Sequence, residues 1–308
     1  MSEQFKIGIA GAGAWGRGLF SAFSSRYGHI TLYSRREDAH GATTNNINDL
    51  SELDYLFLVI PAQEIRNFCK TISRVIKPAC KIVICAKGIE EGSGKLLYEV
   101  VEEELRNNIL LALSGPNFAD EIIAGLPAIS SIACKDMGIA EELAQKFSTK
   151  NFILHPTSDI ASVSVVGALK NVLAILCGIA RGLKIGENGT AAIISKGIKE
   201  IFLLAKTKGG KVESVLEPAF IGDVFLTCSS ITSRNVQFGL KLVTEYLDKG
   251  YEEIITPSTV EGMYTSLSIA RHYKEIELPV LKFVFTAITT KFNKQQEIRS
   301  ALNDIIFT

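Results

Sequence analysis

A lysine and an asparagine interrupt an apolar helical run, and their placement suggests proton-transfer chemistry. The segment "VVGALKNVLAILCGIA", residues 165–180, is apolar or small almost throughout, yet Lys170 and Asn171 lie in its middle. Read as a helix, the run offers Lys170 no acidic partner one turn away. Burial lowers the pKa of a lysine toward the useful range of a general acid. The segment therefore predicts a proton donor at Lys170, although a lysine whose stem packs while its ammonium reaches solvent fits the composition equally well.

A glycine-rich turn near the N-terminus has the pattern of a dinucleotide site. "GAGAWG" places Gly11, Gly13 and Gly16 in G-x-G-x-x-G spacing, directly after a strand-like run and at the start of a helical one. Gly11 permits the tight turn, Gly13 lets a pyrophosphate approach the backbone, and Gly16 lets helix and strand pack closely. The helix N-terminus then faces the phosphates. We expect a dinucleotide here, and a purely structural glycine turn is the alternative.

Further polar groups follow other strand-like runs. Lys87 comes after "KIVICA", and Gly115 and Asn117 come after "ILLAL". Ligands of open α/β sheets bind beyond the carboxyl ends of the strands, which favours a substrate or cofactor contact at these positions. Gly115 would offer a backbone N–H group and Asn117 a side-chain amide. Lys87 could instead have a purely structural role, with its stem covering the sheet edge and its ammonium extending to solvent.

The segment "GDVFLTCSSITSRN" has the donors that a phosphate prefers. Read as one helix, Asp223, Thr227, Ser230 and Arg234 fall along one face. The run from residue 233 to residue 235, Ser-Arg-Asn, adds hydroxyl, guanidinium and amide donors. An arginine is the natural anchor for a phosphate monoester. A solvated amphipathic face is the competing interpretation.

The pattern of the whole chain indicates an α/β fold in two parts. Short apolar runs alternate with helical patterns up to about residue 157, which predicts an N-terminal Rossmann-like, doubly wound parallel sheet covered on both faces. Helical periodicity dominates afterwards and predicts an all-helical C-terminal domain. We therefore expect a dinucleotide-binding domain at 1–157 and a helical substrate and catalytic domain at 158–308.

Composition limits the classes of binding partner and the cellular compartment that we expect for this protein. The chain of 308 residues has 33 basic and 33 acidic side chains, so its net charge suggests neither nucleic acid nor an anionic membrane as a partner. The six cysteines, scattered without a C-x-x-C pair, are expected to be reduced core residues, and the four histidines have no metal-ligand spacing. The N-terminus does not read as a signal peptide, and uncharged runs fall short of the roughly 18 residues of a membrane span. A cytoplasmic protein is expected.

Taken together, the motifs resemble the bacterial-type NAD(P)-dependent glycerol-3-phosphate dehydrogenases. The matching segments are "GAGAWG", "AKGIE", "SGPNFADEI", "GALKNVLAILCGIARGL", "GENGTAA", "GDVFLTCSSITSRN" and "VEGM". The resemblance implies interconversion of dihydroxyacetone phosphate and sn-glycerol 3-phosphate, with Lys170 as the proton donor and acceptor. It implies substrate contacts at Lys87, Gly115, Asn117, Asn171, Asp223, Ser233, Arg234 and Asn235. It implies cofactor contacts at Gly11, Gly13, Ala14, Trp15, Gly16, Arg35, Arg36, Lys87, Ala119, Arg234 and Glu261. A homodimer that supplies glycerophospholipid synthesis is also implied.

The choice between NADP and NAD depends on the end of the second predicted strand. Dehydrogenases that insist on NAD usually carry an acidic residue there, whereas this chain has Ser34, Arg35 and Arg36. Two guanidinium groups favour the 2′-phosphate, so we predict that NADPH is used at least as well as NADH. Alternatively, one arginine stacks on adenine and the other is solvated.

The sequence also departs from the family pattern. Ala14 replaces the usual serine, Arg17 stands where a small residue is common, and Asn117 stands where the family has serine or threonine. The stretch "EPAFIGDV" departs from a glycine-rich family segment, and residues 37–54 form a markedly shortened connection.

Two other functions stay open: a related hydroxyacid dehydrogenase, and a nucleotide-binding regulator without catalysis. The adjacent Lys-Asn pair and the Ser-Arg-Asn cluster argue against the first. Retention of a proton donor argues against the second.

Overall fold

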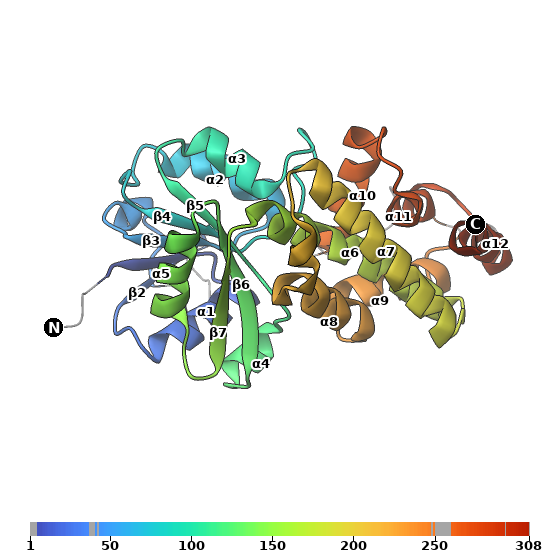
Figure 1. The fold of residues 1–308 in the computed structure, drawn as a ribbon, viewed down its shortest axis with the longest axis horizontal. Coiled ribbons are helices and arrows are strands. Elements are labelled where there is room, and N and C mark those ends of the chain that lie inside the picture. The colour runs from blue at the N-terminus through green and yellow to red at the C-terminus, as the bar shows by residue number, and fades with distance from the viewer. Residues whose placement is uncertain are drawn as a thin grey trace.

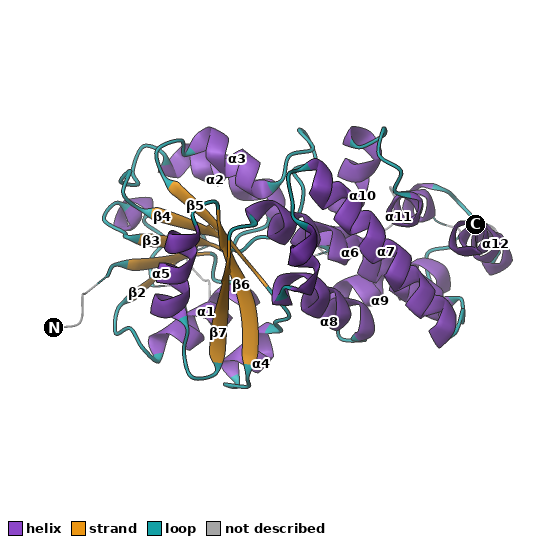
Figure 2. Cartoon of the chain, in the orientation of Figure 1, coloured by secondary structure: helices purple, strands orange, loops and turns teal. Residues whose placement is uncertain are grey.

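The chain folds into a sheet-containing half and a helical half that lie side by side. The computed structural model describes residues 5–36, 41, 43–247, 249, 260–292 and 294–307. In Figure 1 the strands and the helices around them occupy the left side, and the chain from α6 onward occupies the right side. Figure 2 shows strands only in the first half. The predicted fold class, a Rossmann-like sheet followed by helices, is confirmed.

A single seven-stranded sheet has the order β2-β1-β3-β4-β5-β6-β7. The first five strands are parallel neighbours, and their carboxyl ends meet at one edge. The strands are β1 (Ile7–Ala10), β2 (Ile30–Tyr33), β3 (Tyr55–Leu58), β4 (Lys81–Ile84), β5 (Ile109–Ser114), β6 (Ala128–Cys134) and β7 (Phe152–Thr157).

Helices cover both faces of this sheet because its strands alternate their apolar side chains between two cores. Ile7 and Ile9 of β1 join a core with α1 and α5, whereas Ala10 joins a core with α2 and α3. The second core is continuous with the interior of the helical half. The covering helices are α1 (Ala14–Ser24), α2 (Ile65–Ile72), α3 (Leu97–Glu104), α4 (Ala119–Ile123) and α5 (Met137–Phe147).

Two strands were missed in the sequence, and one of them breaks the parallel order that the sequence predicts. β6 runs antiparallel to β5, and β7 runs parallel to β6 at the edge of the sheet. The link between β5 and β6 carries only the five-residue α4. A helix that short cannot carry the chain back across the sheet for a parallel return, so β6 reverses direction.

All six cysteines are buried and free, as expected.

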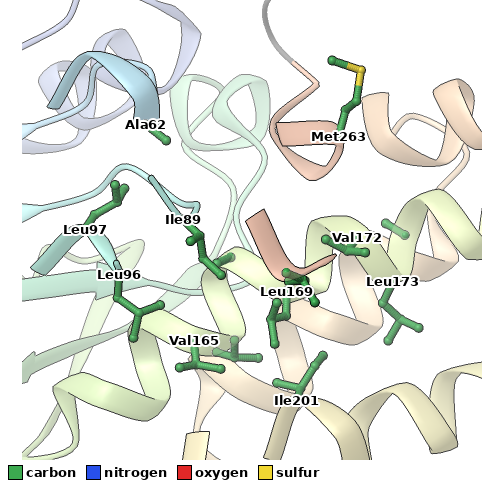
Figure 3. Close-up of a cluster of buried hydrophobic side chains, with 14 of the residues drawn as sticks. Ala62, Ile89, Leu96, Leu97, Val165, Leu169, Val172, Leu173, Ile201 and Met263 are labelled. Atoms are coloured by element: carbon green, nitrogen blue, oxygen red, sulfur yellow. The ribbon is translucent and has the colours of Figure 1, made fainter. Parts of the chain in front are cut away.

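Helix α6 (Ile160–Gly182) is the central element of the helical half, and α7, α8, α9, α10 and α11 pack around it. Figure 3 shows Val165, Leu169 and Leu173 of α6 in the apolar interior, in one cluster with Leu96 of the sheet half and Ile201 of α7. The other elements are α7 (Glu187–Thr207), α8 (Asp223–Ser229), α9 (Arg234–Thr244), α10 (Glu261–His272), α11 (Pro279–Thr289) and α12 (Gln295–Phe307).

Helix α6 is capped at its start and packs closely against α9 farther along. Asp159 accepts a hydrogen bond from the backbone N–H of Ser162 at 2.9 Å and caps the first turn. Farther along, an added Cβ at Gly239 of α9 would lie 1.9 Å from the carbonyl oxygen of Ile175, so this glycine lets the two helices pack at close range. By length and mean hydropathy α6 could cross a membrane, although Lys170 interrupts its uncharged run, but 94% of its most apolar window is buried inside the protein. That burial is typical of a core helix.

The predicted division at residues 157 and 158 falls between the last strand and α6. β7 ends at Thr157, and α6 begins at Ile160. Because one apolar core runs through both halves, independent folding of the two domains stays a prediction.

Candidate active site

Lys170 lies in the interior and has an acidic partner that local sequence does not reveal. Its side chain extends from α6 toward α8, where Nζ lies 2.5 Å from Oδ1 of Asp223 and donates to Oγ1 of Thr227 at 2.7 Å. Lys170 is 6% exposed and Asp223 is 1% exposed. Asp223 and Thr227 are one turn apart on α8, so both face the same ammonium. The interpretation that this ammonium reaches solvent is wrong.

A second lysine reaches the same carboxylate from the sheet. Lys87 follows β4, and its Nζ lies 2.7 Å from Oδ2 of Asp223 and 3.4 Å from the carbonyl oxygen of Gly115. Ser114, the last residue of β5, donates to the same Oδ2 at 3.2 Å. Residues at the carboxyl ends of the neighbouring strands β4 and β5 therefore meet Asp223, and Lys170 of α6 joins them there. Ligands of doubly wound sheets bind at this edge.

This environment sets the protonation of the buried pair. The pKa of Lys170 is lowered to about 8, chiefly by burial, with Asp223 opposing the shift and the charge of Lys87 adding to it. Burial alone would raise the pKa of Asp223, but the two ammonium groups outweigh it and hold that pKa below its ordinary value. The cluster thus keeps a carboxylate charged beside an ammonium that can lose its proton near neutral pH.

Asn171 belongs to a separate polar chain on the adjacent face of α6. Nδ2 of Asn235, on α9, donates to Oδ1 of Asn171 at 3.1 Å, and the N–H of Gly262 donates to Oδ1 of Asn235 at 3.2 Å. An added Cβ at Gly262 would come within 2.5 Å of the Asn171 carbonyl oxygen. The predicted substrate residues Asn171 and Asn235 therefore lie together, with α10 packed closely against them.

The expectation of one continuous helix from Asp223 to Arg234 is wrong. α8 ends at Ser229 and α9 begins at Arg234. Between them the hydroxyl of Ser230 accepts from the backbone N–H of Thr232 at 3.2 Å, a local bond that competes with helix formation. Ser230 thus forms its bonds with Thr232, whereas Arg234 stands in the first turn of α9, exposed and beside Asn235.

The glycine-rich turn has the geometry that a pyrophosphate needs. Gly11 has φ +120°, and its N–H donates to the carbonyl oxygen of Tyr33 at the end of β2. An added Cβ at Gly16 would lie 1.8 Å from the Gly11 carbonyl oxygen, so helix and turn require glycine there. An added Cβ at Gly13 meets nothing within 4 Å. That open approach, before a first helical turn without acidic side chains, fits a bound dinucleotide.

The other predicted cofactor residues surround this turn with different side-chain environments. Ala14 is exposed, whereas the Trp15 ring packs edge-on against Phe152 with 6.4 Å between centroids. Ala119 begins α4, which packs against α1. Arg35 is paired with Glu64 at 3.2 Å, with side chains 71% and 41% exposed. Arg36 is exposed, and its backbone N–H donates to Ser34.

Glu261 and Asn117 complete the predicted set, at positions outside the Lys170 cluster. Glu261 accepts from the backbone N–H of Ala62 at 3.4 Å. Burial raises the pKa of Glu261 to about 7, although the Ala62 N–H and the charge of Arg234 act in the opposite direction. Asn117 donates to Oγ of the buried Ser130 at 2.5 Å. Glu261 is thus held by Ala62 and Asn117 by Ser130, and neither of these bonds involves Lys170 or Asp223.

Sequence reasoning missed Ser114, which contacts the central carboxylate. The available signal was its place as the last residue of a buried strand, directly before Gly115. Thr227 was noticed as a member of a helix face, but its bond to Lys170 was not foreseen.

A doubly wound sheet with this glycine turn, beside a buried lysine and carboxylate, defines a Rossmann-type dinucleotide-dependent oxidoreductase. Residues 40–140 match the family model of the NAD-dependent glycerol-3-phosphate dehydrogenase N-terminus, and residues 159–299 match that of its C-terminus. The chain belongs to the NAD(P)-dependent glycerol-3-phosphate dehydrogenase family. The resemblance inferred from the motifs is thus confirmed.

Similar proteins span nearly the whole chain. A glycerol-3-phosphate dehydrogenase [NAD(P)+] of Zymomonas mobilis is 34% identical, over 92% of this chain and 89% of that protein. One of Brucella ovis is 33% identical over 97% of each. The crystal structure of a Coxiella burnetii glycerol-3-phosphate dehydrogenase superposes with a TM-score of 0.86 at 28% identity, covering 97% of this chain and 99% of that one. The yeast enzyme, at 21% identity, shares the fold with a TM-score of 0.84, over 99% of this chain and 100% of its own.

Proposed function

We propose that the protein interconverts dihydroxyacetone phosphate and sn-glycerol 3-phosphate with NADPH or NADH, and that Lys170 transfers the proton. The observation that carries the proposal is the buried contact of Lys170 with Asp223 and Thr227, beside Lys87. A nicotinamide cofactor supplies or removes a hydride when bound. The chain itself must then supply a proton to the ketone oxygen, or remove one from the alcohol.

Lys170 meets the requirements of that proton donor. Its ammonium is held by two acceptors on α8, which fixes its position, and its pKa of about 8 keeps it largely protonated at neutral pH. Lys87 places a second positive charge on the other side of the carboxylate. That charge can stabilise the oxygen of the substrate as negative charge develops on it. Asp223 pairs with both ammonium groups and orients them.

Recognition of the phosphate is assigned to the start of α9. Arg234 is exposed at the first turn of this helix, where backbone N–H groups also point outward. A guanidinium fork suits a phosphate monoester. Ser233 and Asn235 flank Arg234, and Asn235 is tied to Asn171 next to Lys170. This chain of contacts supports a substrate that extends from the proton donor to Arg234, with Gly115 and Asn117 on the sheet side.

The cellular setting is part of the same proposal. We propose a homodimer, a cytoplasmic location and a role in glycerophospholipid synthesis, which the resemblance of the motifs to the family implies. The balanced charge of the chain is in keeping with a small-molecule substrate rather than nucleic acid or membrane.

Substrate selectivity tests the proposal. Oxidation of NADPH and of NADH is followed by absorbance with dihydroxyacetone phosphate, with unphosphorylated dihydroxyacetone, and with a 2-oxo acid. We expect rapid turnover with the phosphorylated ketone only, because Arg234 has no anion to bind in dihydroxyacetone. Faster turnover of the 2-oxo acid would instead indicate a hydroxyacid dehydrogenase. Cofactor binding without turnover of any of the three ketones would indicate a nucleotide-binding regulator.

A further inference from the structure

Arg17 spans the gap between the glycine turn and the segment that follows β2. Its Nη1 donates to the carbonyl oxygen of Ala12 at 2.8 Å. Cδ of Arg17 lies near Gly41, at 3.7 Å from where a Cβ on that glycine would stand. The side chain is half-buried. The bond to Ala12 therefore holds the guanidinium beside the glycine turn.

That place is the side of the fold where a dinucleotide presents its adenosine ribose. Thr44 forms a parallel bridge with Tyr33, and the Ser34 N–H donates to the Thr44 carbonyl oxygen at 3.1 Å. Thr44 is thus attached to the end of β2. In Rossmann folds the 2′ position of this ribose is read by residues at the end of the second strand, and the pyrophosphate lies on the glycine turn. Arg17 bonds to the glycine turn, and its side chain lies near Gly41, three residues before the bridge at Thr44.

The charges around Arg17 favour an anion. A guanidinium has five N–H donors, and the bond to Ala12 engages only one of the two Nη groups. Within residues 5–36 and the other described segments, Arg17 makes no ion pair. The neighbouring Arg35, in contrast, is neutralised by Glu64. Arg36 is exposed, so its charge is more strongly screened by solvent than that of the half-buried Arg17.

We propose that Arg17 is a specificity-determining residue whose guanidinium binds the 2′-phosphate of NADPH. The phosphate would form charge-assisted hydrogen bonds with the N–H groups that Ala12 leaves free. This arginine therefore adds to the recognition that the sequence assigns to Arg35 and Arg36. The inference rests on the proposed function only through dinucleotide binding, because it requires no turnover.

Equilibrium binding of adenosine 2′,5′-bisphosphate and of AMP isolates the 2′-phosphate. The two ligands share the adenosine and the 5′-phosphate, and their dissociation constants are measured by calorimetry for the native protein and variants. We expect Arg17→Ala to weaken the bisphosphate about tenfold while AMP changes by less than about twofold. Arg17→Lys, which keeps the charge and loses the fork, should lie between. Arg74→Ala removes an exposed arginine beyond the end of α2 and should change neither constant.

The pattern across ligands decides the outcome. An equal loss for both ligands, or no loss for the bisphosphate, overturns the proposal and leaves Arg17 with a packing role or a contact to the 5′-phosphate. If Arg17→Ala fails to fold, Arg17→Gln keeps an N–H donor for the Ala12 carbonyl oxygen and removes the charge, and the same comparison applies. A native protein that binds the ligands as expected but reduces no dihydroxyacetone phosphate refutes the proposed reaction and leaves this inference standing.

Discussion

Asp223→Asn isolates the electrostatic role of the central carboxylate. The substitution preserves the size of the side chain but removes the negative charge between Lys170 and Lys87. Burial and the charge of Lys87 both lower the pKa of Lys170, and Asp223 is the group that opposes them. Without that opposition, the pKa of Lys170 must fall.

The size of the effect follows from the contact distance. A counter-charge within hydrogen-bond reach shifts a pKa by about 1 to 3 units. From its value of about 8, the pKa of Lys170 would therefore drop to between about 7 and about 5 in the variant. At about pH 7.5 the protonated fraction of Lys170 would fall from about three quarters to between about a quarter and less than one per cent. Reduction of the ketone, which needs the protonated lysine, should slow accordingly.

The assay is the pH dependence of kcat/KM for reduction of dihydroxyacetone phosphate, from about pH 6 to about pH 10. For native protein we expect the rate to fall as the pH rises through about 8, because Lys170 loses its proton there. In Asp223→Asn the same decline should begin at lower pH, in addition to any rise in KM. Urea unfolding serves as the control, since removing one partner of a buried pair costs about 3–5 kcal/mol. An unchanged position of the alkaline limb in a folded variant would refute the reasoning.

Four further predictions concern the binding residues and the glycine turn. Arg234→Lys should raise KM for dihydroxyacetone phosphate strongly with a smaller change in kcat, because lysine cannot reproduce the guanidinium fork, and an unchanged KM would remove Arg234 as the phosphate anchor. Arg36→Ala should lower kcat/KM for NADPH more than for NADH, and equal losses would contradict recognition of the 2′-phosphate. Gly13→Val should abolish cofactor binding in calorimetry while leaving thermal unfolding nearly unchanged, since its Cβ meets open space. Gly16→Ala should instead unfold at lower temperature, because its Cβ meets the backbone of Gly11.

The sheet and the glycine turn could be predicted because their signals are local. Near-continuous apolar strands and G-x-G-x-x-G spacing depend on neighbouring residues, and both predictions hold in the structure. The reversal of β6 could not be predicted in the same way. It depends on how far the short α4 carries the chain after Ser114, which is a property of the three-dimensional path.

The tertiary contacts of the Lys170 site could not be predicted from local sequence either. The oddity of Lys170 in an apolar helix was visible in the sequence, but its partner Asp223 lies 53 residues away and joins it only through the packing of α8 on α6. The break at Ser230 was missed because helical spacing alone does not reveal a hydroxyl that bonds the backbone two residues later. Side chains that meet through tertiary contacts therefore needed the structure.

Lys170→Ala tests the central claim, that Lys170 transfers the proton, most directly. The variant is assayed for reduction of dihydroxyacetone phosphate, and its affinity for NADPH is measured by calorimetry on the same preparation. We predict that kcat falls by roughly 10²–10⁴, the usual contribution of a general acid, while the dissociation constant for NADPH stays within about twofold of the native value. A variant that retains near-native kcat would contradict the account and return Lys170 to a packing role.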